Sequence, residues 1–408
     1  MEAVPRRLLL FAATTGYQIR VFADAARRIG AELTLATDRC HILEDPWGDR
    51  AIAVKFDRIP ESLEALRSLA CDGVAAVGDR PAVLAAATAE MLGVAFHPPA
   101  AARACNDKFL ARQLYQAAGL RVPQFFRAGF EEDPHALARR TPYPCVLKPL
   151  GLSASRGVIR ANDEREFVVA FHRIRKMGEQ QLQVESYIEG REFAVEGLVT
   201  AGSLQPLAIF DKPDPLEGPF FEETIYVTPS RQPPAVQQEL IETTARAVGA
   251  LGLRHGPVHA EMRYNREGAW VLEAAARPIG GLCAKALLFE PDVPLEEIIL
   301  RHALGEDVTE ARLASPASGV MMIPIPRDGI YESVEGLEQA RAVAGIEDVI
   351  ITAKEGQRLA PLPEGASYLG FLFARGDGPA EVEAALRRSH VELQFHIATA
   401  LETFKPSS

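Results

Sequence analysis

The stretch VHAEMRYNREGAWVLEAAAR, residues 258–277, alternates apolar and polar side chains on both sides of a short Arg-Glu-Gly loop. Alternation with a period of two is typical of half-buried strands, and a glycine that ends a three-residue loop can adopt the left-handed backbone of a bulged turn. The stretch therefore predicts a β-hairpin with the loop 266–268, in which Asn265 pairs with Ala269.

In this register Glu261 lies directly opposite Glu273, and His259 lies opposite Ala275. Side chains point alternately to the two faces of a strand, so the polar residues share one face. That face carries His259, Glu261, Arg263, Glu273 and Arg277. The opposite face is expected to be a core surface made of Val258, Ala260, Met262, Trp270, Leu272 and Ala274.

The facing carboxylates of Glu261 and Glu273 need an explanation, because their Cβ atoms would be about 5 Å apart and like charges directly opposite each other destabilise a sheet. A cation between them would relieve the repulsion. Carboxylate oxygens are ligands for Mg²⁺, which completes its shell with water and phosphate oxygens. Alternatively, Arg263 and Arg277 neutralise the pair on a solvated face. The hairpin alone leaves both interpretations open.

A candidate phosphate site precedes the hairpin. Residues 146–149 predict an apolar strand with Lys148 near its end, and a buried lysine needs an anionic partner. The Gly- and Ser-rich turn 151–158 follows, and such turns direct backbone N–H groups, here with the hydroxyls of Ser153 and Ser155, toward phosphate oxygens. Hairpin tips of this composition are also common without a ligand, and the chain has no GxxxxGK[ST] Walker loop.

Three further charged residues have two interpretations each. Lys108 follows the expected helix cap Asp107 and is either a phosphate ligand or an ordinary exposed helix lysine. Glu185 and Glu192 lie in two predicted strands joined by a short connection. Each is either a hydrogen-bond acceptor at the edge of a cleft or a surface acid.

The first hundred residues alternate apolar strands with helical stretches, which indicates a parallel α/β sheet. The expected strands are 8–12, 32–36, 52–54, 74–77 and 94–96, and the expected helices include 17–29 and 81–92. Asp79, between the fourth strand and Pro81, is expected to cap a helix. The first turn, 14–17, lacks the GxGxxG pattern, which argues against a dinucleotide site although Asp38 ends the second strand.

The rest of the chain mixes strands and helices. A helix is expected at 107–118, and a strand-rich region with the helix 235–251 inside it extends to about residue 280. The expected elements of the tail are the strands 319–325, 348–352 and 368–374 and the helices near 334–343 and 379–389.

Composition excludes several classes of protein. The net charge of −11 argues against non-specific binding to nucleic acid or an anionic membrane, and 48% apolar with 24% charged residues is an ordinary globular profile. No apolar run approaches the roughly 18 residues of a membrane helix. Residues 8–13 superficially resemble a secretory signal but have no convincing cleavage site, so a buried first strand is expected. Five scattered cysteines without a CxxC pair fit a reducing cytoplasm.

Together and in this order, these residues resemble the ATP-grasp superfamily over roughly residues 1–300, and within it the carboxylate–amine ligases of the L-amino acid (dipeptide) ligase branch. The runs EAAARPIGG, 273–281, and GVMMIPIP, 319–326, are similar to that branch. The resemblance implies an α/β fold, with α+β character in the ATP-binding part. Its expected domains are a Rossmann-like domain at 1–100, the small and large ATP-grasp lobes at 101–182 and 183–310, and an α+β C-terminal subdomain at 311–408.

The resemblance also implies a role for each candidate residue. The phosphates of ATP would meet Lys108 and Lys148 under a loop containing Ser153, Ser155 and Gly157. The adenine would meet Glu185, Tyr187 and Ile188, and the ribose would meet Glu192. Glu261 and Glu273 would hold Mg²⁺, with Mn²⁺ as a substitute, usually as two ions. Arg277, Gly280 and Gly281 would steady an acyl phosphate.

The chain departs from the superfamily at one position. The usual pattern is Glu-x-Asn-x-Arg, and Ala275 stands in the Asn slot, which puts the second Mg²⁺ in doubt. His259, opposite Ala275, either partly fills the vacated space as a catalytic residue or is a histidine satisfied by neighbouring carboxylates.

The irregular segment 211–224 is a second place where substrates are expected. Lys212 could reach phosphate as a catalytic residue, and Glu222 or Glu223 could receive the ammonium group of an amino acid. The alternative is a solvated loop.

The implied reaction is the ATP-dependent formation of an amide bond through an acyl phosphate, with an amino acid as a substrate and with release of ADP and phosphate. Such catalysis rests on positioning and charge neutralisation, and no GxSxG or Cys–His nucleophile is found. The alternatives are another ATP-grasp ligase or carboxylase acting on a metabolite precursor, or a non-catalytic nucleotide-binding sensor. The expected partners are small-molecule carboxylates and amines, with no nucleic acid and no membrane, and a homodimer is compatible with the family.

Overall fold

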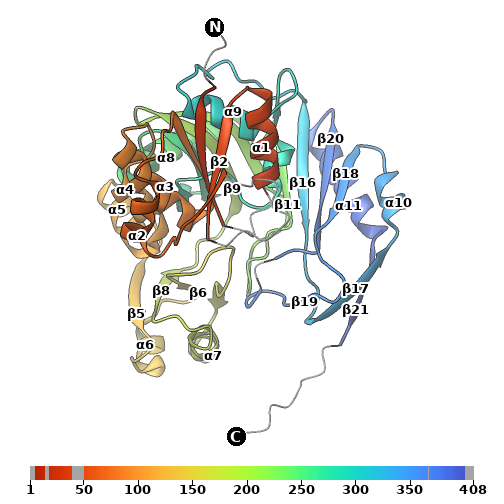
Figure 1. The fold of residues 1–408 in the computed structure, drawn as a ribbon. Coiled ribbons are helices and arrows are strands. Elements are labelled where there is room, and N and C mark those ends of the chain that lie inside the picture. The colour runs from red at the N-terminus through yellow and green to blue at the C-terminus, as the bar shows by residue number, and fades with distance from the viewer. Residues whose placement is uncertain (1–4, 14–17, 39–49, 366, 400–408) are drawn as a thin grey trace, which may run out of the picture. The chain divides into compact units, whose positions relative to one another are not determined.

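The computed structural model describes residues 5–13, 18–38, 50–365 and 367–399 of the 408-residue chain. The chain forms two units, each assembled from three separate segments. Unit 1 comprises residues 1–122, 192–211 and 229–315, and unit 2 comprises residues 123–191, 212–228 and 316–408. Figure 1 labels many of their helices and strands.

Unit 1 begins with a parallel sheet of strand order β3-β2-β1-β4. Its strands are β1 (Arg7–Ala12), β2 (Glu32–Thr37), β3 (Ala51–Ala53) and β4 (Gly73–Val77). Four successive residues of β1, Leu8 to Phe11, are buried, as expected for a parallel strand covered on both faces. The structure confirms four of the five strands predicted for this region.

The fifth predicted strand, 94–96, is wrong. Gly93 has the left-handed backbone, with φ of 71°, that ends the preceding helix, and the Val94 N–H closes this helix end on the Ala89 carbonyl. The chain then enters the next helix at Pro99 without joining the sheet. The turn 14–17 lies outside the described residues.

Seven α-helices of the described part of unit 1 follow the predicted alternation of strands and helices. They are α1 (Ile19–Arg28), α2 (Ile59–Leu66), α3 (Asp79–Leu92), α4 (Pro99–Asn106), α5 (Lys108–Ala117), α8 (Pro234–Leu251) and α9 (Leu295–Ala303). Asp107 caps α5 as predicted, because its carboxylate accepts from the Phe109 and Leu110 N–H groups at 3.0 Å. Asp79 does not cap α3: Gly78 is the N-cap, and the Asp79 carboxylate accepts instead from Arg277.

The predicted hairpin is present in unit 1, in the strand order β13-β12-β9-β10. These strands are β9 (Arg191–Thr200), β10 (Ser203–Lys212), β12 (Gly256–Asn265) and β13 (Gly268–Ala275). Glu261 pairs with Glu273 and His259 pairs with Ala275, so the register predicted for these four residues is confirmed. The 3-10 helix η2 (Cys283–Ala286) and the short strands β14 (Leu288–Phe289) and β15 (Val293–Pro294) follow.

The predicted hairpin loop is wrong by one residue. Asn265 pairs with Gly268 instead of Ala269, and a register shift between Glu261 and Met262 brings the carboxylates back into opposition. Leu272 is the extra residue of this bulge.

The bulge also changes which side chains of β13 enter the core. Because the bulge shifts the alternation along the strand, Val271, paired with Met262, is fully buried. Trp270 and Leu272, predicted as core residues, are only half-buried. The Trp270 indole N–H instead donates to the Asn265 amide oxygen at 3.1 Å.

The first half of unit 2 is a separate sheet with the strand order β5-β8-β6-β7. Its elements are β5 (Phe125–Gly129), α6 (Pro134–Arg140), β6 (Cys145–Pro149), β7 (Ile159–Ala161), α7 (Glu164–Arg175) and β8 (Gln181–Ser186). Phe167, Phe171 and Ile174 of α7 pack onto this sheet in one buried cluster. The predicted strand at 146–149 is confirmed as β6.

The rest of unit 2 holds the chain's C-terminal part. One group of strands has the order β11-β16-β20-β18: β11 (Ile225–Thr228), β16 (Ala317–Ile323), β18 (Ile346–Ile351) and β20 (Gly370–Gly376). A second has the order β19-β17-β21: β17 (Gly329–Glu335), β19 (Arg358–Leu359) and β21 (Gln394–Ala398). The helices are α10 (Leu337–Arg341) and α11 (Pro379–Val391). The predicted tail strands are present, but the helix expected at 334–343 is shorter because β17 extends to Glu335.

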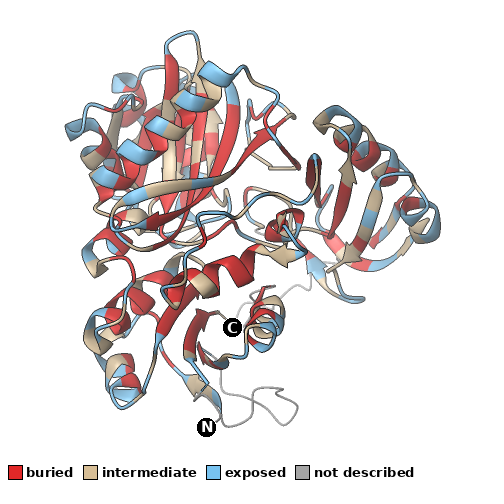
Figure 2. Ribbon diagram, turned by 90° about the horizontal axis from the view of Figure 1, so that it is seen from above, coloured by how far each residue is buried: buried red, intermediate tan, exposed pale blue. Residues whose placement is uncertain are grey.

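Burial follows the pattern of layered sheets and helices. Buried residues concentrate on the strands and on one side of the helices, whose other side is exposed (Figure 2). Among the described helices, none has the length and apolar character needed to cross a membrane. The division into domains ending at residues 100, 182 and 310 remains a prediction.

Candidate active site

The paired carboxylates of Glu261 and Glu273 in the β12–β13 hairpin are the centre of the candidate site in unit 1. Both side chains are half-buried. Burial raises the pKa of Glu273, and the charge of Glu261 raises it further, whereas Lys108 and Arg277 act to lower it. Two acids and two cations that lie far apart in the sequence therefore share one electrostatic environment.

The donor set fits Mg²⁺. Carboxylate oxygens are the hard ligands that this ion prefers, and a divalent cation would relieve the repulsion that raises the pKa of Glu273. A carboxylate oxygen of Glu192 also lies within 4.8 Å of one of Glu261. Of the two arginines in the alternative, Arg263 donates from Nε–H to Glu192 at 3.1 Å, whereas Arg277 acts to lower the pKa of Glu273. Neutralisation of the pair by arginine therefore stays open beside the metal.

Arg277 is oriented by Asp79, the residue that was predicted to cap a helix. Its Nε–H donates to the Asp79 carboxylate at 2.8 Å, and its Nη1 donates to the Pro278 carbonyl at 3.1 Å. Burial alone would lower the pKa of Arg277, but Asp79 and Glu273 raise it. For Asp79 the shift is downward: burial would raise its pKa, but Arg277 outweighs burial and lowers it. The ion pair fixes the guanidinium beside the carboxylates.

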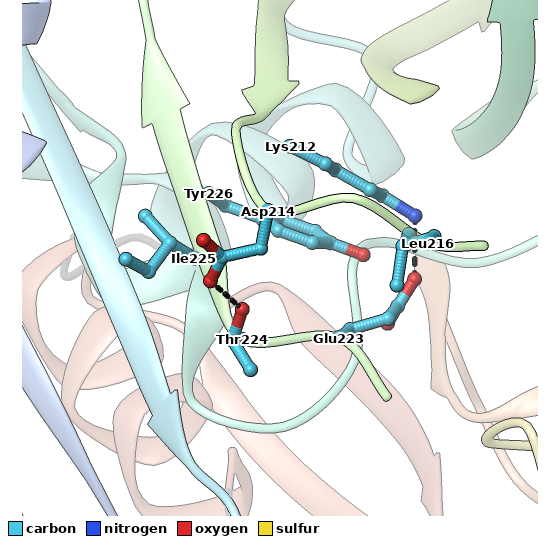
Figure 3. Close-up of a pocket in the computed structure, with 7 residues that line it drawn as sticks. All are labelled: Lys212, Asp214, Leu216, Glu223, Thr224, Ile225 and Tyr226. Carbon is cyan, nitrogen blue, oxygen red and sulfur yellow. Dashed lines mark hydrogen bonds and ion pairs between the residues drawn. The ribbon is translucent and has the colours of Figure 1, made fainter. Parts of the chain in front are cut away.

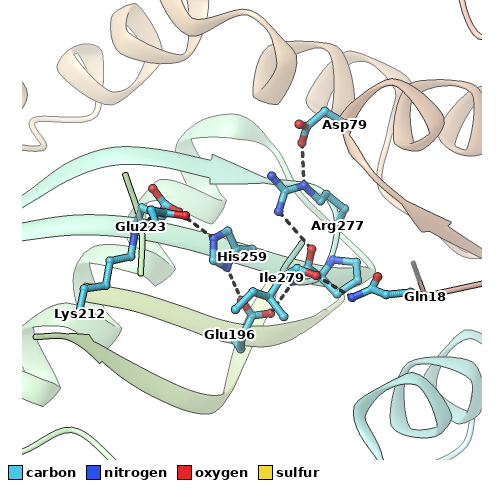
Figure 4. A network of polar contacts seen from close by, with 10 residues as sticks. Gln18, Asp79, Glu196, Lys212, Glu223, His259, Arg277 and Ile279 are labelled. Atoms are coloured by element: carbon cyan, nitrogen blue, oxygen red, sulfur yellow. Dashed lines mark hydrogen bonds and ion pairs between the residues drawn. The ribbon is translucent and has the colours of Figure 1, made fainter. Parts of the chain in front are cut away.

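His259 lies between two carboxylates, as Figure 4 shows for its contact with Glu196. Its Nδ1 bonds to Glu196, and its Nε2 lies 3.1 Å from Glu261. Burial alone would lower the pKa of His259, but these two acids raise it to about 9. The imidazole is therefore a cation at neutral pH and donates to both acids. This contact set agrees with the interpretation of a histidine satisfied by neighbouring carboxylates, while a catalytic role remains a prediction.

Glu196 extends the network to the segment that follows β13. Its second carboxylate oxygen accepts from the Ile279 N–H at 3.1 Å, and the Ile279 carbonyl accepts from the Gln18 side chain at 2.9 Å (Figure 4). The backbone just before Gly280 and Gly281 is thus held from two sides. Gly281 has a left-handed φ of 62°, and Gly280 is exposed.

In unit 2, the anionic partner expected for Lys148 is Glu185. The Lys148 Nζ lies 2.6 Å from a Glu185 oxygen, and the other Glu185 oxygen accepts from the Gln183 amide at 2.6 Å. Glu185 is almost fully buried, at 2% exposure. The two residues predicted for the phosphate and the adenine are therefore paired with each other across β6 and β8.

The phosphate loop, residues 153–157, has an exposed tip and a buried end. Ser153 is exposed and Ser155 half-exposed, whereas Gly157 is buried and donates its N–H to the Pro363 carbonyl at 2.9 Å. Ala154 and Ser155 both adopt φ of 55°, a conformation that side chains rarely take. The tip is exposed to solvent, whereas the Gly157 N–H is already bonded to the protein.

Tyr187 anchors the connection after β8. The Arg160 guanidinium lies 4.1 Å from the centre of the Tyr187 ring, and the Phe221 ring stacks on Tyr187 at 6.4 Å. Arg160 also donates to the Glu217 carbonyl at 2.8 Å. The connection that contains Ile188 and the irregular segment around Phe221 are thus joined within unit 2.

A small pocket lies in the irregular segment, lined by Lys212, Asp214, Leu216, Glu223, Thr224, Ile225 and Tyr226 (Figure 3). Lys212 forms an ion pair with Glu223 and lies 4.9 Å from the centre of the Tyr226 ring. Glu222 is not part of this lining, and burial raises its pKa. The solvated-loop alternative therefore does not describe Lys212, which is 7% exposed.

Within unit 1 the structure brings together Lys108, Glu192, His259, Glu261, Glu273 and Arg277. Within unit 2 it pairs Lys148 with Glu185 and Lys212 with Glu223. Asp79 and Glu196 also belong to this site, and neither was predicted as a site residue. Only an unusual feature of Asp79, an acid between a strand end and a helix start, could have drawn attention to it.

Two family models match the chain. The ATP-grasp domain matches residues 141–286, and the L-amino acid ligase C-terminal domain 2 matches residues 321–398. Both matched ranges include residues singled out above for the site or for the resemblance.

Relatives and a solved structure agree with these matches. D-alanine–D-alanine ligase from Pseudomonas entomophila is 29% identical over 42% of this chain and 54% of that protein, and alanine–anticapsin ligase from Bacillus subtilis is 27% identical over 47% and 45%. The chain thus spans about half the length of these relatives. The structure of an L-amino acid ligase from Bacillus licheniformis has a TM-score of 0.81 and 24% identity and covers 97% of this chain and 100% of that one.

That structural likeness shows a shared fold, and the two matched domains occur in the order of the resemblance. The chain therefore carries an ATP-grasp domain, followed by the C-terminal domain 2 of L-amino acid ligases.

Proposed function

We propose that the protein is an ATP-dependent carboxylate–amine ligase that uses an amino acid as a substrate. The observation that carries the proposal is the Glu261–Glu273 pair, with Lys108 and Arg277 in the same electrostatic environment. This arrangement suits the binding of a metal–nucleotide complex and the neutralisation of a phosphoryl group in transfer.

The proposed reaction has two steps. An oxygen of the substrate carboxylate attacks the γ-phosphorus of ATP, so that ADP leaves and an acyl phosphate forms. An amine then attacks the acyl carbon, the C–O bond to phosphate breaks, and the amine loses a proton as the amide forms. Phosphate is a good leaving group where oxide is not, which is why the carboxylate is activated first.

In unit 1, the proposed roles follow the contacts. Glu261 and Glu273 would bind Mg²⁺, or Mn²⁺ in its place, and a bound divalent ion supplies charge neutralisation at phosphate oxygens. Arg277, held by Asp79, would face the acyl phosphate, with Gly280 and Gly281 offering backbone contacts. The remaining unit 1 roles are phosphate contact for Lys108 and ribose binding for Glu192.

In unit 2, the proposed roles are those of nucleotide and substrate binding. Lys148, Ser153, Ser155 and Gly157 would contact phosphates, and Glu185, Tyr187 and Ile188 would bind adenine. Because Glu185 is paired with Lys148, the nucleotide would have to compete with or rearrange this contact. Lys212, Glu222 and Glu223 would contact substrate, with the Lys212–Glu223 pair holding complementary charges for the two ends of an amino acid.

The test is phosphate release from ATP and Mg²⁺ with the twenty amino acids, singly and in pairs, with mass detection of products. We expect release that depends on a particular pair and a product with the mass of the two amino acids less one water. Nucleotide binding without turnover on amino acids or other carboxylate–amine pairs would contradict a ligase and favour a nucleotide-binding sensor.

A further inference from the structure

A turn in the C-terminal part of unit 2 holds the buried end of the phosphate loop. This C-terminal turn, residues 361–365, lies in the range matched by the L-amino acid ligase C-terminal domain 2. The Pro363 carbonyl accepts from the Gly157 N–H at 2.9 Å, and the Glu364 carbonyl accepts from the Arg156 Nε–H at 3.2 Å. Two consecutive loop residues are thus bonded to two consecutive residues of the turn.

The fit at Gly157 leaves little freedom. Gly157 has a left-handed φ of 67°, and a Cβ there would lie 2.8 Å from Pro149 Cγ and 3.1 Å from Met177 Sδ. The other end of the Gly/Ser-rich turn is also held, since the Gly151 N–H donates to the Glu179 carboxylate at 2.9 Å. Between these two ends the tip is exposed at Ser153 and Ala154.

The C-terminal turn is itself clamped to helix α7. Arg173 makes a bidentate pair with Glu364, with Nε–O and Nη2–O distances of 2.6 and 2.9 Å. The Arg173 hydrogen bond holds the pKa of Glu364 below its usual range, and Glu364 in turn raises that of Arg173. The Arg173 guanidinium therefore holds the C-terminal turn, and the turn holds the buried end of the phosphate loop.

Arg173 also reaches the irregular segment that precedes β11. Its guanidinium lies 5.0 Å from the centre of the Phe220 ring, and Phe220 forms a β-bridge with Ile159 at the start of β7. The Arg160 N–H donates to the Pro219 carbonyl at 2.9 Å. The phosphate loop and the proposed substrate segment are thus attached to the same short framework.

We infer that Arg173 and Glu364 are positioning residues that anchor the phosphate loop through the C-terminal turn. The anchored end fixes where the tip closes, so the γ-phosphate is covered and the acyl phosphate is kept from water. The kinetic consequence of this anchor rests on the proposed ligase function, whereas its effect on loop motion does not.

The experiment compares wild type with Arg173→Ala, Glu364→Gln and the charge exchange Arg173→Glu with Glu364→Arg. Arg175→Ala, an exposed arginine in the last turn of the same helix, is the matched control. Hydrogen exchange is measured at residues 153–157 with and without Mg-ATP. The KM for ATP and the ratio of phosphate released to amide formed are measured with the substrate pair identified for the enzyme.

In the two single variants we expect exchange at Gly157 and the phosphate-to-amide ratio each to rise by about threefold to fivefold, since an exposed ion pair is worth a factor of up to about five. The charge exchange should restore both quantities at least in part, and Arg175→Ala should match wild type. Unchanged exchange at Gly157 in folded single variants would overturn the anchor. If wild type shows no turnover, the proposed function fails, and the exchange data still decide the anchor.

Discussion

At the scale of single residues, the site depends on charges that oppose one another at close range. Glu273 is the sharpest case, because burial and Glu261 both raise its pKa. We predict that Glu273→Gln lowers Mg²⁺-dependent ATP turnover by at least about 100-fold. Loss of this ligand would weaken metal binding and, with it, the neutralisation of charge on the transferred phosphoryl group. Mn²⁺ titration followed by electron paramagnetic resonance would show weakened metal binding independently of activity.

Glu267→Gln is the control for that change, because Glu267 is an exposed acid in the turn of the same hairpin. It should leave metal binding and turnover at the wild-type level. Equal losses in both variants would mean that the hairpin as a whole, and not the Glu261–Glu273 pair, had been disturbed.

Asp79 is predicted to matter for both stability and turnover. Replacing Asp79 by Asn leaves the guanidinium of Arg277 largely buried without its anionic partner, which typically costs about 3 kcal/mol when a buried ion pair is broken. We expect a lower melting temperature and a turnover at least about tenfold lower, because Arg277 is no longer held in place.

The matched control is Asp72→Asn, which removes the acid of the exposed Arg7–Asp72 pair in the same unit. Exposed ion pairs contribute about 0–1 kcal/mol to stability. Calorimetry should therefore show only a small change in melting temperature, and turnover should be unchanged. A similar shift in melting temperature for Asp79→Asn and Asp72→Asn would count against a special role for Asp79.

What the sequence predicts about these residues depends on whether their partners are near in the chain. Glu261 and Glu273 face each other across one hairpin, so the spacing alone placed them correctly. Asp79 lies 198 residues before Arg277. Sequence spacing cannot tell which residues meet over such a separation. The local helix-capping pattern therefore predicted the wrong partner for Asp79.

At the scale of secondary-structure elements, the hairpin shows how a bulge changes the face of a strand. Val271 is fully buried, and Leu272 is the extra, half-buried residue. We predict that Val271→Ala lowers the free energy of unfolding by about 2 kcal/mol, and that Leu272→Ala lowers it by less than about 1 kcal/mol. Denaturant titration checks both, and the reverse order would indicate the regular register without a bulge.

His97, in the connection between α3 and α4, predicts a dependence of stability on pH. The Arg254 N–H donates to Nδ1 of His97 at 3.2 Å, so Nε2 must carry the proton that it donates to the Pro257 carbonyl at 2.9 Å. The ring is therefore neutral. Burial, followed by the nearby His255, lowers its pKa to about 4, and His302 in the same region has a pKa of about 4 for similar reasons.

The direction in which stability changes with pH follows from the protons bound by the folded and the unfolded chain. Below the unfolded value of about 6.5 the unfolded chain binds a proton that folded His97 does not, so stability falls from pH 6.5 toward pH 4. Between pH 7.5 and 5, we expect wild type to lose about 2 kcal/mol more unfolding free energy than His97→Gln. Guanidinium titrations at both pH values measure the difference, and parallel pH dependences would contradict the assignment.

Regular elements were the most predictable part of the chain. The strands of the parallel sheet and the helix α5, with its Asp107 cap, follow from local patterns that the structure confirms. The bulge at Leu272 could not be predicted, because a bulge is selected by packing of both faces and leaves no separate signal in an alternating sequence. The strands β17 and β21 were not predicted, because most of their residues are half-buried or exposed and so give no clear apolar pattern.

At the scale of the whole molecule, each unit is assembled from three separate segments, so that chain order and spatial grouping differ. In unit 1, residues of the parallel sheet and of the β12–β13 hairpin belong to one continuous apolar core. The order of the motifs indicated the superfamily, but the grouping of distant segments arises from tertiary packing. The same packing places the C-terminal turn against the phosphate loop in unit 2.

The proposed function requires that a carboxylate is activated by direct phosphorylation. It is tested most directly by following ¹⁸O from a labelled substrate carboxylate into the products of a single turnover, with mass detection of phosphate. We expect one ¹⁸O in the released phosphate, because the oxygen that attacks the γ-phosphorus leaves with it. Unlabelled phosphate, or label found in AMP with release of pyrophosphate, would contradict an acyl phosphate and with it the proposed reaction.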